Sequence, residues 1–207
     1  MIKKMLKQTS LYFFWKEYCE IRDYWRWLKN GRPVPPPHGI KQGVIKEYAG
    51  EYQCPVFFET GTYNGDMIQA VKDDFKQIFS VELSESLYKQ ARLRFNNDDH
   101  ISLLQGDSGK VLPETLKRIS EPCLFWLDAH YSGANTAKGD KFSPIMEEVL
   151  PILDHKVRNH VILIDDAREF TGKDGYPEIV KFTQEVTQIR QDLKIVVELD
   201  IIRIFHK

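Results

Sequence analysis

Two hydrophobic patterns alternate between residues 55 and 205. Short, continuous apolar runs are typical of buried strands, and the longer segments between them carry apolar residues at helical spacing. Strands are expected at 55–60, 77–82, 100–105, 122–127 and 160–165, with helices near 65–76, 84–96, 109–119, 143–157 and 176–191. Strands that alternate with helices form right-handed crossover units, so the pattern predicts a parallel sheet with helices on its faces.

The C-terminal end departs from this alternation. Two further apolar runs, 194–199 and 201–205, follow each other almost directly. A crossover helix needs roughly a dozen or more residues, so these two strands are expected to pair antiparallel. The sequence therefore predicts an α/β fold whose sheet is parallel except at its C-terminal end.

The first 50 residues differ in character from the rest. Residues 9–30 predict a helix rich in aromatic side chains, and the run Pro-Val-Pro-Pro-Pro at 33–37 is a stiff spacer. A further short helix is expected at 40–50. We therefore divide the chain into an N-terminal arm with its proline-rich linker, residues 1–50, and a main domain, residues 51–207.

The aromatic helix of the arm has two interpretations. It packs on the main domain or on a second copy of the chain, or it lies on a membrane surface, because its aromatic side chains alternate with basic ones. Glu17, Glu20 and Asp23 reduce the positive charge that an acidic membrane would attract. We favour a packed arm, which makes a homodimer one expected arrangement.

Composition sets the broad class of the protein. A hydrophobic share of 42% supports a sizeable core, and no segment is long and apolar enough to span a membrane. The formal net charge of −1 gives no general attraction to nucleic acid, so we expect no nucleic-acid partner. The three cysteines lack the spacing of a zinc site or a disulfide framework, which favours a reducing, cytoplasmic location.

The first predicted strand ends in an acid and a glycine loop, which is the pattern of a ligand site. In an open parallel sheet, ligands bind at the carboxyl ends of the strands, where glycines let the backbone approach closely. The loop consists of Gly61, Thr62, Tyr63, Asn64 and Gly65. Glu82, followed by Leu83, ends the second strand at the distance from the loop that suits an acid binding a ribose.

The loop favours an adenosine ligand with an amino-acid tail over a dinucleotide. In the dinucleotide fingerprint the middle glycine lies near the pyrophosphate, and Tyr63 occupies that position here. Glu59, just before the loop, would repel a pyrophosphate but attract the ammonium group of an amino acid. Asp107 and Ser108 follow the third strand and are placed to bond an adenine edge. The alternative for this pair is ordinary capping of the next helix.

These motifs, in this order, resemble those of class I S-adenosylmethionine-dependent methyltransferases over about residues 55–205. The resemblance implies a Rossmann-like, doubly wound sheet of seven strands, mostly parallel with an antiparallel C-terminal strand. It also implies the cofactor S-adenosylmethionine (SAM), with the loop near its methionine part and Glu82 on its ribose. The expected cofactor-binding residues are Glu59, Gly61, Thr62, Tyr63, Asn64, Gly65, Glu82, Leu83, Asp107, Ser108 and Asp128.

Three carboxylates are expected to meet at the same edge of the sheet. Asp128 follows the fourth strand, and Asp165 and Asp166 follow the fifth. Clustered carboxylates repel one another unless a proton, a partner or a cation neutralises them. Oxygen ligands suit a hard divalent ion such as Mg²⁺, so these three are the expected metal ligands. The alternative is a helix cap or an ion pair with Arg168.

The acid cluster resembles that of metal-dependent O-methyltransferases of the catechol type and of related sugar O-methyltransferases. The resemblance implies that Asp128 helps catalysis by holding a metal that lowers the pKa of an acceptor hydroxyl. The catechol type carries a lysine three residues after its first metal-binding Asp, whereas this chain has Tyr131. His130 is therefore the expected general base, with Lys138 as the alternative.

Two polar loops, 131–142 and 170–177, are expected to form the walls of the acceptor site. Polar walls favour a saccharide or another small molecule with vicinal hydroxyls over a flat apolar ring. His38, Lys41 and Gln42, in the short helix that follows the spacer, are placed to cover the cleft.

The sequence leaves two other functions open. The same fold and acids would also suit a different metal-assisted reaction, such as an oxidation or a hydrolysis. A non-catalytic module that binds an adenosine ligand, with the arm docking a partner or a membrane, is the alternative from another class.

Overall fold

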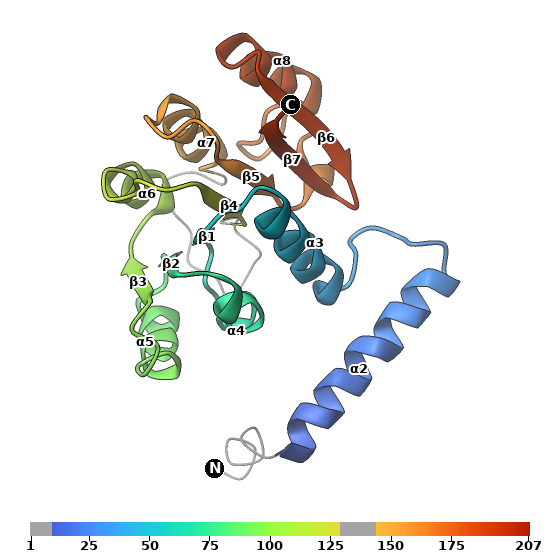
Figure 1. Cartoon of the computed structure of the whole chain (residues 1–207). Helices are drawn as coiled ribbons and strands as arrows, with labels where there is room; N and C mark the ends of the chain where they lie inside the picture. Colours follow the sequence, from blue (N-terminus) through green and yellow to red (C-terminus); the bar gives the residue numbers. More distant parts are fainter. Residues whose placement is uncertain (1–9, 129–143) are drawn as a thin grey trace.

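The structure is a computed structural model that describes residues 10–128 and 144–207, with side chains described from residue 18 onward. Its centre is a seven-stranded sheet (Figure 1). The strands are β1 (Val56–Thr60), β2 (Gln77–Glu82), β3 (Ile101–Gln105), β4 (Cys123–Leu127), β5 (Val161–Ile164), β6 (Leu193–Glu198) and β7 (Ile201–His206).

The order of the strands across the sheet is β3-β2-β1-β4-β5-β7-β6. The strands from β3 to β5 pair in parallel, and β7 is antiparallel to both of its neighbours, β5 and β6. The predicted sheet, parallel except at its C-terminal end, is confirmed. The order reverses between β1 and β4, and a reversal of this kind opens a crevice at the carboxyl ends of the strands.

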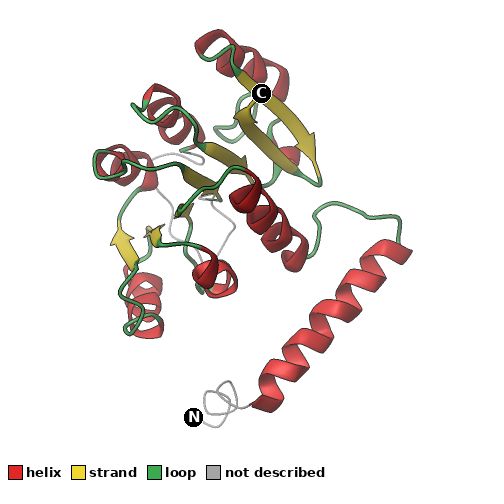
Figure 2. Ribbon diagram, viewed as in Figure 1, coloured by secondary structure: helices red, strands yellow, loops and turns green. Residues whose placement is uncertain are grey.

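Helices cover both faces of the sheet (Figure 2). They are α2 (Ser10–Lys29), α3 (His38–Glu51), α4 (Asp66–Val71), α5 (Glu85–Arg94), α6 (Ser108–Leu116), α7 (Ile145–Asp154) and α8 (Ile179–Ile189). Two short 3-10 turns are η1 (Lys72–Asp74) and η2 (Ala167–Glu169). The helix predicted at 65–76 is therefore shorter than expected, because α4 ends at Val71 and the chain tightens into η1.

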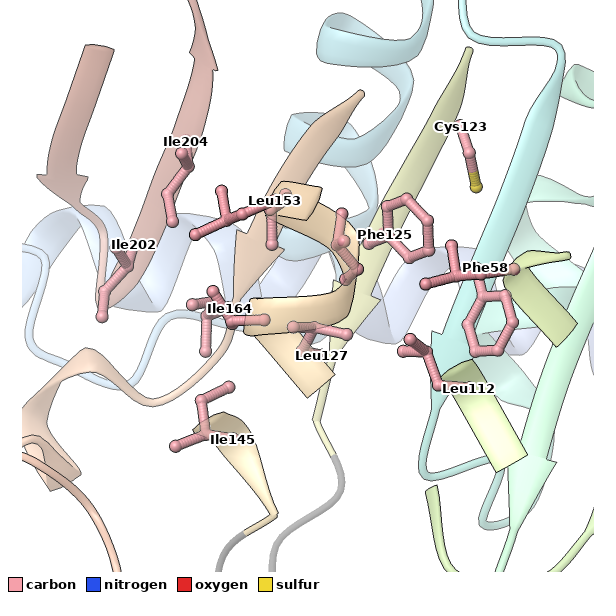
Figure 3. Packing of buried hydrophobic residues seen from close by; sticks show 14 of the residues in the cluster. Phe58, Leu112, Cys123, Phe125, Leu127, Ile145, Leu153, Ile164, Ile202 and Ile204 are labelled. Atoms are coloured by element: carbon pink, nitrogen blue, oxygen red, sulfur yellow. The ribbon is translucent and has the colours of Figure 1, made fainter. Parts of the chain in front are cut away.

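The two faces of the sheet have separate cores, since neighbouring residues of a strand point to opposite sides. Phe58 of β1 packs with Leu112 of α6 and Phe125 of β4 in one cluster, and the Phe58 and Phe125 ring centroids lie 5.6 Å apart (Figure 3). Phe57 packs on the other face, with Ile45 of α3 among its cluster. This double cover is the doubly wound arrangement that the sequence predicted.

Helix α3 belongs to the packed body of the protein. Its buried residues Val44, Ile45, Tyr48 and Ala49 all lie in the second core cluster. The boundary expected between residues 50 and 51 falls at the end of this helix, and we propose that the packed body begins at His38 and that the arm comprises the residues before it.

Helix α2 extends away from the sheet (Figure 1). Near its C-terminal end, Trp27 is buried, at 7% exposed. Its Nε1 donates a hydrogen bond of 2.8 Å to the carbonyl of Pro33 in the linker. Tyr18, Ile21 and Trp25 are exposed. Within the described residues, no helix has the length and apolar character needed to cross a membrane.

Candidate active site

Four strands end level with one another at the crevice. Thr60 at the end of β1 pairs with Val81 of β2 and Leu127 of β4, and Leu127 pairs with Ile164 of β5. The residues that follow these strands therefore meet at one edge of the sheet. This places the glycine loop, the acid that ends β2 and the acids that follow β4 and β5 around the same crevice.

The glycine loop turns sharply from β1 into α4. Gly61 and Gly65 have φ angles of +87° and +73°, which glycine adopts without strain. A Cβ atom at Gly65 would lie 2.6 Å from the ring of Phe95, so no larger residue fits there. The backbone N–H groups of Gly61 and Thr62 donate to the carbonyl of Val81, which anchors the loop to β2.

Glu82 holds this loop from the neighbouring strand. Its Oε2 accepts a hydrogen bond of 2.7 Å from the backbone N–H of Tyr63, and its Oε1 accepts one of 2.8 Å from the backbone N–H of Ser84. A carboxylate can accept further bonds at both oxygens, so these contacts still leave acceptor capacity for a ribose diol. Leu83 follows directly, and its carbonyl accepts from the side chain of Gln105.

Glu59 lies buried beneath the glycine loop. Its Oε2 accepts a hydrogen bond of 2.7 Å from Ser80, whose hydroxyl also lies 2.6 Å from that of Thr62. Burial, strengthened by the charge of Asp128, raises the pKa of Glu59 to about 8. A cationic group bound nearby would favour the ionised form of this carboxyl group.

The segment after β3 caps a helix. Asp107 Oδ1 accepts a hydrogen bond of 3.0 Å from the backbone N–H of Gly109, which makes Asp107 the N-cap of α6. The capping alternative is thus realised for Asp107. Ser108 is buried at the first position of the helix.

Glu148 of α7 is a residue of this region that the sequence did not single out. It is 1% exposed and lies against the hydroxyls of Ser108 and Thr60, while Thr60 Oγ1 accepts from the backbone N–H of Asp128. Burial raises the pKa of Glu148 to about 7. Its Oε1 has no hydrogen-bond partner among the described residues. The sequence shows only two acids in the first turn of a helix, which is an ordinary solvated pattern.

The three aspartates expected to bind a metal come together. Each of Asp128, Asp165 and Asp166 offers a carboxylate oxygen, and these oxygens lie within 4.8 Å of one another. Asp166 has a left-handed backbone with a φ of +56°, which turns the chain sharply after β5. Burial and the neighbouring charges of Asp128 and Asp166 raise the pKa of Asp165, and Lys41 opposes that shift. The donor set fits a hard divalent cation.

Two cationic side chains reach the acid cluster. Lys41 of α3 forms an ion pair with Asp165, and its Nζ lies 3.7 Å from Asp166 Oδ1. Arg168 donates a hydrogen bond of 2.8 Å to Asp166 Oδ1 and also pairs with Asp200. The ion pair weighed as an alternative from the sequence is therefore present at Asp166. Lys41 therefore lies beside the acids that follow β5.

The remaining candidates are placed as follows. His130 lies outside the described residues, as does the polar loop 131–142, which contains Tyr131 and Lys138. The second polar loop, 170–177, is described: Phe170 at its start is buried, and Tyr176 donates its backbone N–H to the carbonyl of Lys173.

Comparison with known proteins identifies the fold. No protein-family profile and no curated protein sequence matches the chain. Among solved structures, the SAM complex of the O-methyltransferase TomG from Streptomyces achromogenes, involved in tomaymycin synthesis, is similar at 15% identity and a TM-score of 0.60 over 89% of this chain and 87% of that one. The SAH-bound methyltransferase PaMTH1 from Podospora anserina matches at 18% identity and a TM-score of 0.58, over 97% of both chains.

The similar structures are not confined to one kind of acceptor. The 23S rRNA methyltransferase ErmE matches at 18% identity and a TM-score of 0.50, over 80% of this chain and 68% of that one. At these identities the comparisons establish a shared fold. The chain has the fold of class I SAM-dependent methyltransferases, as the sequence motifs predicted.

Proposed function

We propose that this protein is a SAM-dependent O-methyltransferase that uses a divalent cation. The observation that carries the proposal is that two chemically different sites share one crevice. Glu59 and the glycine loop suit an adenosine ligand with a cationic amino-acid tail, and the acid cluster of Asp128, Asp165 and Asp166 suits a hard cation. A methyl donor and a metal-bound hydroxyl are the two reactants that such a pair would bring together.

The chain's own residues would bind and orient the cofactor. Glu59 would hold its ammonium group, the backbone of the glycine loop would bind its methionine part, and Glu82 would accept hydrogen bonds from the ribose hydroxyls. Asp107 and Ser108 would bind the adenine. Bound SAM supplies an electrophilic methyl group on a sulfonium. Holding that methyl in line with the acceptor oxygen accounts for much of the rate in a reaction of this type.

The acid cluster would hold the divalent ion through carboxylate oxygens of Asp128, Asp165 and Asp166. When bound, such an ion lowers the pKa of a coordinated hydroxyl. We propose His130 as the base that takes the hydroxyl proton, with Lys138 as the alternative. The acceptor oxygen then forms a bond to the methyl carbon while the carbon–sulfur bond breaks, and S-adenosylhomocysteine leaves.

The acceptor that we propose is a saccharide or another small molecule with vicinal hydroxyls. The polar loop 170–177 supports this choice, because Thr171, Lys173 and Asp174 offer hydrogen-bonding groups rather than an apolar slot. The described cysteines are free, which supports a reducing, cytoplasmic location as part of the same proposal.

The first test is calorimetric titration of SAM into the purified protein, followed by methyl transfer to a panel of diols and saccharides with Mg²⁺ and with a chelator. Micromolar binding and cation-dependent transfer are expected. Asp165→Asn should lower transfer by roughly a hundredfold or more while SAM still binds, because the acceptor hydroxyl is no longer activated. Asp99→Asn, at an exposed aspartate just before β3 and away from the crevice, is the matched control.

Three other results would each change the conclusion. Failure to bind SAM would overturn the cofactor and the proposal with it. A rate of methyl transfer that is unchanged by the chelator and by Asp165→Asn would show that the reaction does not use a divalent ion. Binding of SAM without transfer to any hydroxyl would favour the non-catalytic module.

A further inference from the structure

The acid cluster already contains a cation supplied by the chain itself. Lys41 forms an ion pair with Asp165, and its Nζ lies 3.7 Å from Asp166 Oδ1. The side chain of Lys41 is only 13% exposed, and those of the two aspartates are 3% and 7% exposed. These charges are therefore poorly screened by water, and the interaction between them is stronger than in a surface ion pair.

The position of Lys41 follows from the packing of α3. Val44, Ile45 and Tyr48 bury one face of this helix in the core. Lys41 lies on the same face, one helical turn before Val44 and Ile45 and two turns before Tyr48. The helix therefore directs the lysine stem inward, toward the end of β5. Lys41 and Asp165 are 124 positions apart along the chain, so only the docking of α3 on the sheet brings them together.

An ammonium group and a divalent ion compete for these carboxylates. Mg²⁺ binds its ligands at about 2.1 Å and needs the same Asp165 and Asp166 carboxylates that face Lys41. An ammonium kept within hydrogen-bonding distance of those oxygens would also be strongly repelled by the doubly charged ion. Occupancy of the cluster by Lys41 and occupancy by a divalent ion therefore oppose each other.

We propose that Lys41 is the resident counter-cation of the acid cluster, and that a divalent ion binds there only by displacing it. Lys41 neutralises the clustered carboxylates when no metal is bound, and it sets how tightly, and which, divalent ions bind. The inference rests on the divalent ion of the proposed function. It adds a thermodynamic linkage. The ion pair between Lys41 and Asp165 connects the first turn of α3 to the end of β5, so metal binding weakens this ion pair and the ion pair weakens metal binding by the same factor.

The test is calorimetric titration of Mg²⁺ and of Mn²⁺ into four proteins: the unmodified chain, Lys41→Met, Lys41→Arg and Lys46→Met. Removing the competing charge should make Lys41→Met bind both ions roughly tenfold tighter or more. Lys41→Arg keeps the charge and should stay weak. Lys46→Met removes a lysine of the same helix that pairs with Asp74 at the surface, so its affinity should match that of the unmodified chain.

Each outcome bears on the proposal. Equal or weaker metal binding by Lys41→Met overturns the displacement while leaving the divalent ion of the proposed function in place. If none of the four proteins binds either ion, the divalent ion fails and the displacement fails with it. Tight binding by Lys41→Met alone supports the displacement. Lys41→Gln is a second neutral variant, with the same expected gain, should Lys41→Met fail to fold in a thermal unfolding scan.

Discussion

Buried carboxyl groups lie on both faces of the sheet near the end of β1. Glu59 contacts Ser80, whereas Glu148 lies against Thr60 and Ser108, and neighbouring strand residues such as Glu59 and Thr60 point to opposite faces. Burial raises the pKa of Glu59 to about 8 and that of Glu148 to about 7. Near neutral pH these groups still bind protons that ordinary glutamates have lost. The free energy of unfolding therefore depends on pH.

Glu148→Gln should reduce the loss of stability with rising pH. Glu148 binds its proton in the folded protein up to about pH 7, against an ordinary pKa of 4.5. Between these values the folded state binds more protons than the unfolded state, so the free energy of unfolding falls as pH rises. The variant lacks this contribution, which is at most about 3 kcal/mol.

Urea unfolding at pH 5 and pH 8 measures the effect. The difference between the two pH values should be smaller in Glu148→Gln than in the unmodified chain. Glu114→Gln, at an exposed glutamate, is the control and should leave the difference unchanged. An equal pH difference in Glu148→Gln and the unmodified chain would show that Glu148 ionises normally in the folded protein.

Gly65, at the junction of the glycine loop and α4, packs against Phe95 at the end of α5. Gly65 has a φ of +73°, and the ring of Phe95 occupies the space where a Cβ would lie. Gly65→Ala should therefore destabilise the protein by roughly 1–3 kcal/mol and weaken SAM binding, because the loop has to shift. Chemical unfolding and SAM titration measure the two effects.

Gly43→Ala is the matched control for this prediction. Gly43 lies inside α3 with open space where a Cβ would point, so alanine should leave stability unchanged or raise it slightly. If Gly65→Ala proved as stable as Gly43→Ala, the close packing of Phe95 on the loop would be ruled out.

At the scale of the whole molecule, the exposed face of α2 suggests assembly. Tyr18, Ile21 and Trp25 are 64%, 53% and 64% exposed, and their spacing places them on one side of the helix. Alternating steps of three and four residues are the pattern by which helices pair. We predict a homodimer in which two copies of α2 bury this face.

Ile21→Glu should convert the dimer to a monomer, because it places a charge in the paired face. Sedimentation velocity measures the association at a protein concentration of about 50 µM, which exceeds the Kd of a dimer with micromolar affinity. Arg26→Ala, at an exposed position outside the stripe, should remain a dimer. A monomeric unmodified chain would contradict the prediction, and vesicle flotation would then test the membrane-surface interpretation of the arm.

The alternation of apolar runs and amphipathic segments was enough to predict the strands, the parallel sheet and the antiparallel C-terminal pair, whereas the doubly wound arrangement was implied by the family resemblance. It succeeded because a strand buried on both faces is an unbroken run of apolar residues, as from Val161 to Ile164, which can be recognised from the sequence alone. The motifs at the strand ends were found the same way, since parallel strands bring their carboxyl ends to one edge. The extent of α4 was not predicted, because no local signal marks where it tightens into η1.

The sequence by itself determined which acids would follow which strands, and hence that Asp128, Asp165 and Asp166 would meet. The tertiary structure alone decided that Lys41, 124 positions before Asp165 in the chain, pairs with this cluster. It alone also decided that Glu148 is buried against Thr60 and Ser108. The physical reason is that the strand segments and their parallel pairing follow from local pattern and general topology. A contact between a helix and a strand end depends on how side chains pack across the sheet.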